Sequence, residues 1–270
     1  MDNTLNIVVV GATGKMGQTL IEEIYKDLQT NLVGAIEHKN SPHIGENSGY
    51  FCGMDNGISI SSTFDSLIEQ ADVLIDFTRP EASLEYLTFC KKNKINYVLG
   101  TTGFTEAEKD EITKFSQDIA ICFAPNMSMG INLLLSLVKS ATKALHDDFD
   151  IEIIESHHKD KVDAPSGTAI ELGEMVANNS GRTLKEHGTF KREGNMDPRD
   201  RKEIGFSTIR GGDIVGDHTV LYAGEGERLE LTHKASSRKT FAKGALKAAK
   251  YLKGKTDGLF NMQDVLGLNK

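Results

Sequence analysis

The segment from Glu155 to Thr168, ESHHKDKVDAPSGT, concentrates side chains that can bind an anion and move a proton. It carries two adjacent histidines and two lysines at the end of an expected strand, and then Pro-Ser-Gly-Thr, which is typical of a helix start. A helix start presents N–H groups to an anion, a lysine can supply a positive charge or a proton, and a histidine titrates near neutral pH. Composition alone fits two interpretations, a solvated charged loop or an anion-binding catalytic loop. We expect no bound metal, because adjacent strand residues point to opposite faces and no third ligand is evident.

A second candidate site is the glycine-rich segment IVVVGATGKMG near the start of the chain. It places Gly11, Gly14 and Gly17 between an expected strand and an expected helix, the context in which a glycine loop can bind a dinucleotide. Gly11 permits a tight turn, Gly14 leaves room for a pyrophosphate, and Gly17 allows the helix to pack closely. A turn with only a packing role is the alternative. A Walker-type phosphate loop is excluded, because Lys15 is followed by Met16 rather than by Ser or Thr.

Glu37 follows the second expected strand, where a carboxylate can accept hydrogen bonds from ribose hydroxyls. A free carboxylate there favours NAD over NADP, whose extra phosphate it would repel. His38 and Lys39 oppose this, since either could meet that phosphate, so we expect a mixed preference.

Three further loops follow strand ends, where ligands of open α/β sheets bind. They are Phe77–Pro80, Gly100–Gly103 and Ala124–Met127. Together they could wall a nicotinamide; taken singly, each is also explained by simple turn chemistry.

The elements that must position these residues follow from hydrophobic patterning. In the first half, short β-branched runs alternate with amphipathic stretches, which predicts a parallel sheet with crossover helices. Runs such as IVVV and VLIDF lack polar alternation, as expected for strands covered on both faces. The expected strands are Asn6–Val10, Leu32–Ile36, Ile58–Ser61, Val73–Phe77, Tyr97–Leu99 and Ile119–Phe123. The expected helices are Met16–Leu28, Thr63–Gln70, Pro80–Lys92 and Thr105–Ser116.

The pattern changes after an apolar helix expected at about Ile131–Leu145. Asp150–Ser156 alternates as a strand with one polar face. Its successors are a helix at Thr168–Asn178, strands at Ile204–Ile209, Asp217–Ala223 and Arg228–Thr232, and a closing helix at Lys239–Leu252. We expect the last three strands to be antiparallel neighbours, because no long helix separates them.

The predicted fold class is therefore α/β. A Rossmann-type doubly wound parallel sheet is followed by an α+β domain on a mostly antiparallel sheet. We assign residues 1–127 plus 239–270 to a dinucleotide-binding domain, and residues 128–238 to a substrate-binding and oligomerisation domain.

Length and charge limit the function classes. At about 150 residues a domain, 270 residues correspond to two domains or one large one. The net charge of −8 disfavours nucleic acid and anionic membrane surfaces as partners, and no apolar stretch approaches the roughly 18 residues of a spanning helix. Cys52, Cys90 and Cys122 show neither a disulfide framework nor metal-ligand spacing, so we expect a reducing, cytoplasmic location.

The motifs GATGKMG, FTRPE, GTTGF, APNMS and ESHHKDKVDAPSGTA, in this order and spacing, resemble the 4-hydroxy-tetrahydrodipicolinate reductase (dihydrodipicolinate reductase) family. The resemblance continues through IGFSTIRGGDIVGDHTV and ERLELTHKASSR to GLFNMQDVLGL, which is essentially the whole chain. The HHxxKxDAPSGT block is the specific part, whereas the glycine loop alone fits many dehydrogenases.

The resemblance implies a role for each matching position. His157 takes the family's acid/base position and Lys161 its proton-donor position, while His158, Gly167 and Thr168 grip a substrate carboxylate. The implied cofactor residues are Gly11, Ala12, Thr13, Gly14, Lys15, Met16, Glu37, His38, Gly100, Thr101, Thr102, Ala124, Pro125, Asn126 and Met127. Family members often carry Arg directly after the acidic residue, whereas this chain has His38, so the resemblance leaves the preference between NADH and NADPH open.

The resemblance also implies the reaction, a step of lysine and diaminopimelate synthesis. A hydroxylated cyclic dicarboxylate loses water, accepts hydride from NADH or NADPH, and is then protonated. A small dicarboxylate is thus the expected substrate, and the expected assembly is a homotetramer.

Three alternatives remain open at this stage. One is another two-domain nicotinamide enzyme, such as an amino-acid dehydrogenase; a semialdehyde dehydrogenase would need a nucleophilic cysteine, for which Cys122 lies in an unfavourable strand position. The second is a regulator that senses NAD(P)H without turnover, which would have no use for the HHKDK and PSGT cluster. The third, a nucleic-acid binder, is disfavoured by the net charge and by an aromatic content of 7%.

Overall fold

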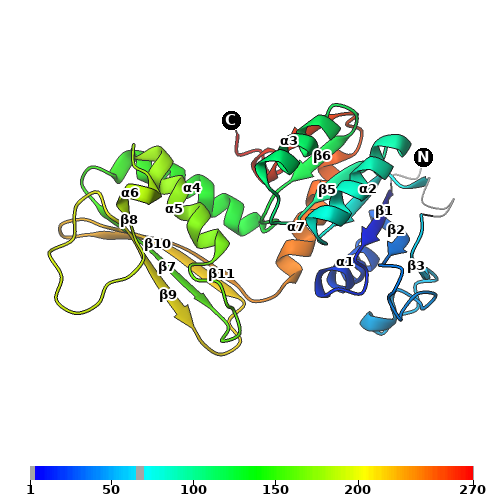
Figure 1. The fold of residues 1–270 in the computed structure, drawn as a ribbon, viewed down its shortest axis with the longest axis horizontal. Helices are drawn as coiled ribbons and strands as arrows, with labels where there is room; N and C mark the ends of the chain where they lie inside the picture. Colours follow the sequence, from blue (N-terminus) through cyan, green and yellow to red (C-terminus); the bar gives the residue numbers. More distant parts are fainter. Residues whose placement is uncertain (1–3, 65–69, 270) are drawn as a thin grey trace. The chain divides into compact units, whose positions relative to one another are not determined.

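A computed structural model describes residues 4–64 and 70–269 (Figure 1). The chain divides into two compact units. The first contains the described residues up to Met129 together with those from Arg238 onward, and the second is Gly130–Ser237. The chain therefore leaves the first unit once and returns to it near its end.

The first unit is built on a seven-stranded sheet in the order β12-β6-β5-β4-β1-β2-β3. Every strand pairing described in it is parallel. Its strands are β1 (Leu5–Val10), β2 (Thr30–Ile36), β3 (Ile60–Ser61), β4 (Val73–Asp76), β5 (Asn96–Leu99), β6 (Ala120–Phe123) and β12 (Gly258–Phe260). Its helical segments are α1 (Lys15–Lys26), the 3₁₀ turn η1 (Tyr50–Cys52), α2 (Pro80–Asn93), α3 (Glu106–Phe115), α7 (Lys239–Leu252) and α8 (Met262–Leu266).

Both faces of this sheet are covered, as the unbroken apolar runs predict. Along β1, Ile7 and Val9 pack in one core cluster with α1 and α7, whereas Val8 and Val10 pack in another with α2 and α3. This two-sided burial is the reason that the strand shows no polar alternation. It leaves the loops at the carboxyl ends of the strands as the polar part of the sheet.

The second unit has a five-stranded sheet in the order β11-β10-β7-β9-β8. Its strands are β7 (Asp150–His157), β8 (Gly188–Thr189), β9 (Ile204–Arg210), β10 (Gly216–Ala223) and β11 (Arg228–Ala235). Its helices are α4 (Met129–Leu145, which begins at the unit boundary), α5 (Gly167–Asn179) and α6 (Leu184–His187). In Figure 1, α4 and α5 lie on one side of this sheet.

The fold class is confirmed, with one correction to the second sheet. It is mixed: β10 pairs antiparallel with β7 and β11, whereas β9 pairs parallel with β7 and β8. The expectation that β9 and β10 are neighbours was wrong, because β7 lies between them. The helix α5 supplies the crossover that a parallel β7–β9 pair needs. The five residues 211–215 can reach across one strand, since two strand spacings are about 10 Å and five residues extend to about 17 Å.

In the described part of the second unit, helices cover one face of the sheet. Ile151 and Ile153 of β7, with Val220 and Tyr222 of β10, pack there against α4 and α5. Side chains on the opposite face, such as Thr219 and Leu221, remain partly exposed. The strand DIEIIES therefore alternates for the reason predicted from its sequence.

Most expected elements lie within a few residues of the observed ones. The expected helix Thr63–Gln70 falls largely on residues 65–69, outside the described part of the chain. The short elements η1, α6, β8, β12 and α8 were not predicted, because segments of two to five residues carry too little periodicity. Within residues 4–64 and 70–269, no helix combines the length and apolar character that crossing a bilayer requires.

Candidate active site

The glycine loop of the first unit leaves space for a ligand at the start of α1. Gly11 has a φ of +67°, a left-handed conformation that favours glycine, and a Cβ there would lie 2.8 Å from Thr78 Cγ2. A Cβ on Gly17 would lie 2.2 Å from the Gly11 carbonyl oxygen, so the helix can approach the loop only with glycine at that position. No side chain caps the N-terminus of α1. Its first N–H groups are thus suited to an anionic ligand.

Glu37 is fixed to this loop. Its Oε2 accepts hydrogen bonds from the Thr13 N–H at 2.9 Å and the Thr13 hydroxyl at 2.6 Å, and its Oε1 accepts one from the His38 N–H at 2.8 Å. Burial by itself raises the pKa of Glu37, but these hydrogen bonds outweigh it and leave the pKa below its ordinary value. Glu37 is therefore an ionised carboxylate at neutral pH, held beside the glycine loop.

A cavity of about 590 Å³ adjoins both features. The residues that line it are Gly11, Thr13, Gly14, Glu37, His38, Phe77, Thr78, Arg79, Ala82 and Tyr86. The glycine loop, Glu37 and the loop after β4 thus come together around one space, as their positions at strand ends predicted.

A buried carboxyl group organises two of the loops on this rim. Asp76, which is fully buried at the end of β4, accepts hydrogen bonds from the Thr78 N–H at 2.7 Å and the Tyr97 hydroxyl at 2.7 Å. The hydroxyls of Ser83 and Thr101 also donate to it. Asp76 therefore connects the loop after β4, the start of α2 and the loop after β5.

The other expected cofactor residues differ in what they can offer. The side chains of Ala12, Ala124 and Met127 lie in the hydrophobic core, so only their backbone groups could face a cofactor. Met127 packs so closely on α7 that a Cβ on Gly244 would lie 1.7 Å from its carbonyl oxygen. Other expected cofactor residues have exposed side chains, including Lys15, Thr102 and Pro125.

In the second unit, a row of polar side chains crosses the face that the helices cover. The strand register pairs Glu155 with His218 on β10 and with Thr208 on β9, and pairs His218 with His233 on β11. Paired residues point to the same face of a sheet. Glu155 lies two residues beyond Ile153, so the buried face changes from apolar to polar towards the end of β7.

His157 is buried at the end of this strand and contacts two ionisable neighbours. Its Nδ1 lies 2.6 Å from Glu155 Oε2, and its ring meets the His218 ring edge-on, with centroids 5.1 Å apart. Burial, reinforced by the nearby His157 charge, lowers the pKa of His218 to about 4, so His218 is neutral at physiological pH. The Ser166 hydroxyl accepts from the Ala169 N–H and lies 3.0 Å from His218 Nε2, to which it can donate its proton.

The remaining predicted substrate residues lie on the loop after β7 and at the start of α5. Lys161 donates to both carboxylate oxygens of Asp163, at 2.7 and 2.8 Å. Its backbone N–H donates to the His158 carbonyl. Gly167 is exposed, with nothing within 4 Å of where its Cβ would be. The expected catalytic and substrate residues thus lie on two consecutive segments, the end of β7 with its following loop and the start of α5. Lys161 is held by Asp163.

Sequence reasoning missed three residues of this cluster, Glu155, Arg210 and His218. Period-two alternation could have placed Glu155 on the same face as His157. Arg210 and His218 lie 55 and 63 positions from Glu155 in the chain, and only the strand register brings them to it. No local pattern carries that register.

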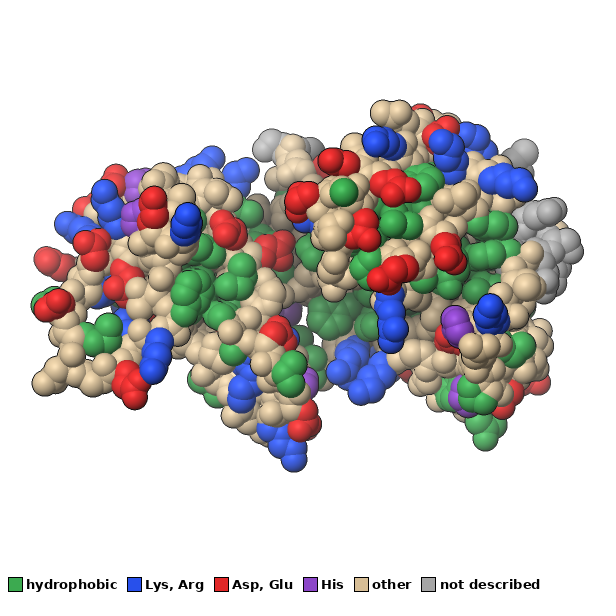
Figure 2. Space-filling view, viewed as in Figure 1, with side chains coloured by type: hydrophobic (Ala, Val, Ile, Leu, Met, Phe, Trp, Pro, Cys, Tyr) green, Lys and Arg blue, Asp and Glu red, His purple; other side chains and the backbone are tan. Residues whose placement is uncertain are grey.

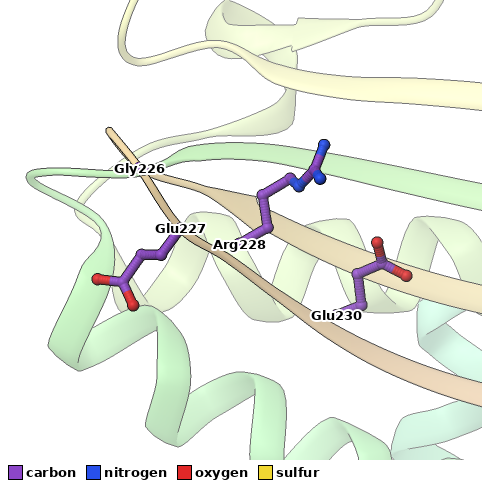
Figure 3. Close-up of a pocket in the computed structure, with 5 residues that line it drawn as sticks. Gly226, Glu227, Arg228 and Glu230 are labelled. Atoms are coloured by element: carbon purple, nitrogen blue, oxygen red, sulfur yellow. The ribbon is translucent and has the colours of Figure 1, made fainter.

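A wider hollow of about 730 Å³ lies at the turn between β10 and β11, at the opposite end of β10 from Gly216 (Figure 3). Arg228 and Glu230 point to one side of the strand there, and Glu227 to the other. It is an open, charged surface. On the face that Figure 2 shows, acidic and basic side chains are interspersed over each unit.

Comparison with known families covers both units of the chain. Residues 5–127 match the model of "Dihydrodipicolinate reductase, N-terminus", and residues 130–266 match that of "Dihydrodipicolinate reductase, C-terminus". The chain belongs to the dihydrodipicolinate reductase family. Its C-terminal family segment includes α7 and β12, which return to the first unit.

Individual relatives cover nearly the whole chain. The 4-hydroxy-tetrahydrodipicolinate reductase of Nitrosomonas eutropha is 53% identical over 264 residues, 98% of each chain. The protein of the same name from Neisseria meningitidis serogroup C is 50% identical over 265 residues, again 98% of each.

Solved structures show the same fold. A dipicolinate-bound dihydrodipicolinate reductase from a Paenisporosarcina species has a TM-score of 0.77 at 24% identity, over 97% of this chain and 98% of that one. A myo-inositol dehydrogenase from Corynebacterium glutamicum has a TM-score of 0.56 at 14% identity, over 98% and 93%. Enzymes with different names thus share the fold, so function must be argued from the site residues.

Proposed function

We propose that this protein reduces 4-hydroxy-tetrahydrodipicolinate to tetrahydrodipicolinate, a step of lysine and diaminopimelate synthesis. The substrate loses one water, takes up a hydride from NADH or NADPH, and takes up one proton. The products are tetrahydrodipicolinate, the oxidised nicotinamide and water. The names of the relatives and the agreement of both family segments support this reaction.

In this proposal the first unit binds the dinucleotide. The cradle at Gly11 and the uncapped start of α1 fit a pyrophosphate, because they offer N–H groups without obstructing side chains. Glu37 accepts hydrogen bonds from ribose hydroxyls, and the loops joined by Asp76 shape the rim of the cavity. When bound, the nicotinamide supplies the hydride.

Either NADH or NADPH serves in this proposal. The ionised Glu37 disfavours a ribose phosphate, whereas Arg79 and His38 line the same cavity and can offset that repulsion. Assays with both cofactors at matched concentrations test this balance.

The second unit binds the dianionic substrate. His158 and the N-terminus of α5, at Gly167 and Thr168, hold a carboxylate. Lys161 supplies the proton, and its ion pair with Asp163 holds the ammonium group in place. His157 acts as the acid/base partner, with Nε2 as the reacting nitrogen because Nδ1 faces Glu155.

One observation carries the proposal. The HHxxKxDAPSGT block, the most family-specific part of the sequence, folds so that a buried histidine–carboxylate pair lies beside the Ser166-capped start of a helix. A regulator that only senses NAD(P)H has no use for this pair.

The test is a spectrophotometric assay that follows loss of the reduced nicotinamide. The substrate is the freshly made condensation product of pyruvate and aspartate semialdehyde, with NADH and NADPH run side by side. Oxidation that depends on this substrate supports the proposal. Tight cofactor binding with no oxidation would favour a sensing role instead.

The assembly and location are part of the same proposal. We propose a homotetramer, built through the uncovered face of the second sheet, where Ile209 is an exposed hydrophobic side chain. We propose a cytoplasmic location because Cys52, Cys90 and Cys122 are free thiols. Light scattering coupled to gel filtration measures the subunit number.

A further inference from the structure

Glu155 is the most enclosed carboxylate of the second unit's site, with 1% of its surface exposed. It lies on β7, the central strand of the five, two residues before His157 and therefore on the same face. An unpaired carboxylate in such a position would be strongly destabilising, so its partners indicate what it does.

Those partners come from three different elements. Arg210 at the end of β9 donates from Nη1 to Oε2 and from Nη2 to Oε1, both at 2.8 Å. The backbone N–H of Ser166, the N-cap of α5, donates to Oε1 at 3.1 Å. The Thr208 hydroxyl, also on β9, donates to Oε1 at 3.3 Å. His157 Nδ1 lies 2.6 Å from Oε2. Burial alone raises the pKa of Glu155, but Arg210 and the other donors outweigh it and hold the pKa below its ordinary value.

This arrangement determines the proton position on His157. An ionised carboxylate only accepts hydrogen bonds, so Nδ1 must carry a proton and Nε2 is the nitrogen that can exchange one. A Cβ on Gly216 would lie 3.0 Å from Nε2, so the glycine leaves room beside the reacting nitrogen.

The same network reaches the loop that carries the proton donor. Arg210 Nη2 also donates to the Asp163 carbonyl at 2.6 Å, and the Asp163 carboxylate holds Lys161. The Gly211 N–H donates to the His157 carbonyl at 2.9 Å. The end of β9 thus joins His157, the Lys161 loop and the start of α5 to one another.

We propose that Glu155, held by Arg210, is a positioning residue for the reduction: it fixes the His157 tautomer and the place of His157 relative to the start of α5. This rests on the proposed function, in which His157 and α5 act on the substrate. Glu155 itself need not touch the substrate.

The primary variant is Glu155→Gln, which keeps the size and removes the charge. We expect kcat to fall by about 10- to 100-fold, with the KM for NADH unchanged, because the cofactor site lies in the other unit. The matched control is Glu152→Gln. Glu152 lies on the same strand and is also held at both oxygens by an arginine, Arg192, but it has no contact with His157. A structural role of such a pair would lower stability in both variants, whereas only Glu155→Gln should lower kcat.

Two further arms keep the inference testable if Glu155→Gln does not fold. Arg210→Lys keeps the positive charge but loses the paired hydrogen bonds to the two Glu155 carboxylate oxygens. We expect a smaller loss of kcat than in Glu155→Gln. Nitrogen NMR of the His157 ring should show a proton fixed on Nδ1 in the wild type and mixed tautomers in Arg210→Lys. The inference is overturned if the wild-type ring is not protonated at Nδ1, or if kcat falls equally in Glu152→Gln.

The NMR arm needs no turnover, so it separates this inference from the proposed function. A wild-type protein that oxidises no NADH or NADPH with the expected substrate refutes the reaction. In that case a fixed Nδ1 proton would still support the tautomer half of the inference, and its absence would refute both.

Discussion

Each unit of this protein places one buried carboxyl group near the carboxyl end of an inner strand, but the two groups have opposite surroundings. Asp76 in the first unit accepts hydrogen bonds from a backbone N–H and from the hydroxyls of serine, threonine and tyrosine, all of which are neutral. Glu155 in the second unit is held by a guanidinium and faces an imidazole.

The difference corresponds to the two halves of the proposed reaction. Hydride transfer needs the cofactor to be held in one place but requires no acid or base at the cofactor. The neutral donors around Asp76, here called the first or neutral cage, are enough to fix the loops after β4 and β5. The groups around Glu155 and His157 form the second cage. Protonation of the product requires groups that gain and lose a proton, so the second cage contains charged and titratable side chains. Variants of the first cage should therefore change cofactor affinity, and variants of the second should change turnover.

The largest expected effect is at the proton-transfer residues. We expect His157→Ala and Lys161→Ala each to lower kcat by about 10²- to 10⁴-fold, because each removes a positioned proton donor or acceptor. Binding of NADH, measured by fluorescence titration, should be unchanged. Near-normal turnover in both variants would contradict the assignment.

The second-largest expected effect is a pH dependence of the unfolding free energy that arises from the second cage. His218, whose pKa is about 4 in the folded protein against an ordinary value of 6.5, faces His157, Glu155, His233 and Lys161. Between these pH values the unfolded chain binds a proton on this side chain and the folded protein does not, so stability is lost as the pH falls from 6.5 towards 4. The loss attributable to His218 is on the order of 3 kcal/mol.

Urea unfolding of the wild type and of His218→Asn, across this pH range, measures that effect. The gap in unfolding free energy between the two proteins should narrow as the pH falls. A gap that stays constant would show that folding does not lower the pKa of His218. The described donors to Asp76 include no histidine, so Ser83→Ala, which removes one of them without removing a titratable group, should not change this pH dependence.

The third prediction concerns the neutral cage. Asp76→Asn places an amide N–H₂ where the carboxyl oxygens accepted hydrogen bonds, so at least one donor loses its acceptor. We expect NADH to bind about tenfold more weakly, equivalent to about 1.4 kcal/mol, because the loops after β4 and β5 are no longer held together. Ser83→Ala, which removes one of the four donors, is the milder companion variant. Equal cofactor affinity in all three proteins would break the proposed division of roles.

The smallest expected effect is on cofactor preference. Glu37→Gln removes the ionised carboxylate beside the glycine loop but keeps a side chain that can accept from Thr13. We expect the ratio of kcat/KM for NADPH to that for NADH to rise about fivefold, equivalent to about 1 kcal/mol of relieved repulsion. An unchanged ratio would mean that Glu37 does not face the ribose.

Local pattern was sufficient for much of this protein. Unbroken apolar runs such as IVVV identified strands buried on both faces, and the alternation of DIEIIES identified a strand with one covered face. The glycine spacing predicted a tight turn at the start of α1, where Gly11 has a left-handed φ and a Cβ on Gly17 would overlap the Gly11 carbonyl oxygen. These features depend on neighbours within a few residues, which is why the sequence by itself determined them.

Tertiary structure decided what depends on distant neighbours. Nothing local in the sequence shows that β7 lies between β9 and β10, because strand order reflects which surfaces bury each other once α5 has crossed the sheet. The same register brings Arg210 and His218 to Glu155 and so fixes the proton on His157. The residue types therefore identified the chemistry, and the pairing of distant strands determined how those residues are held.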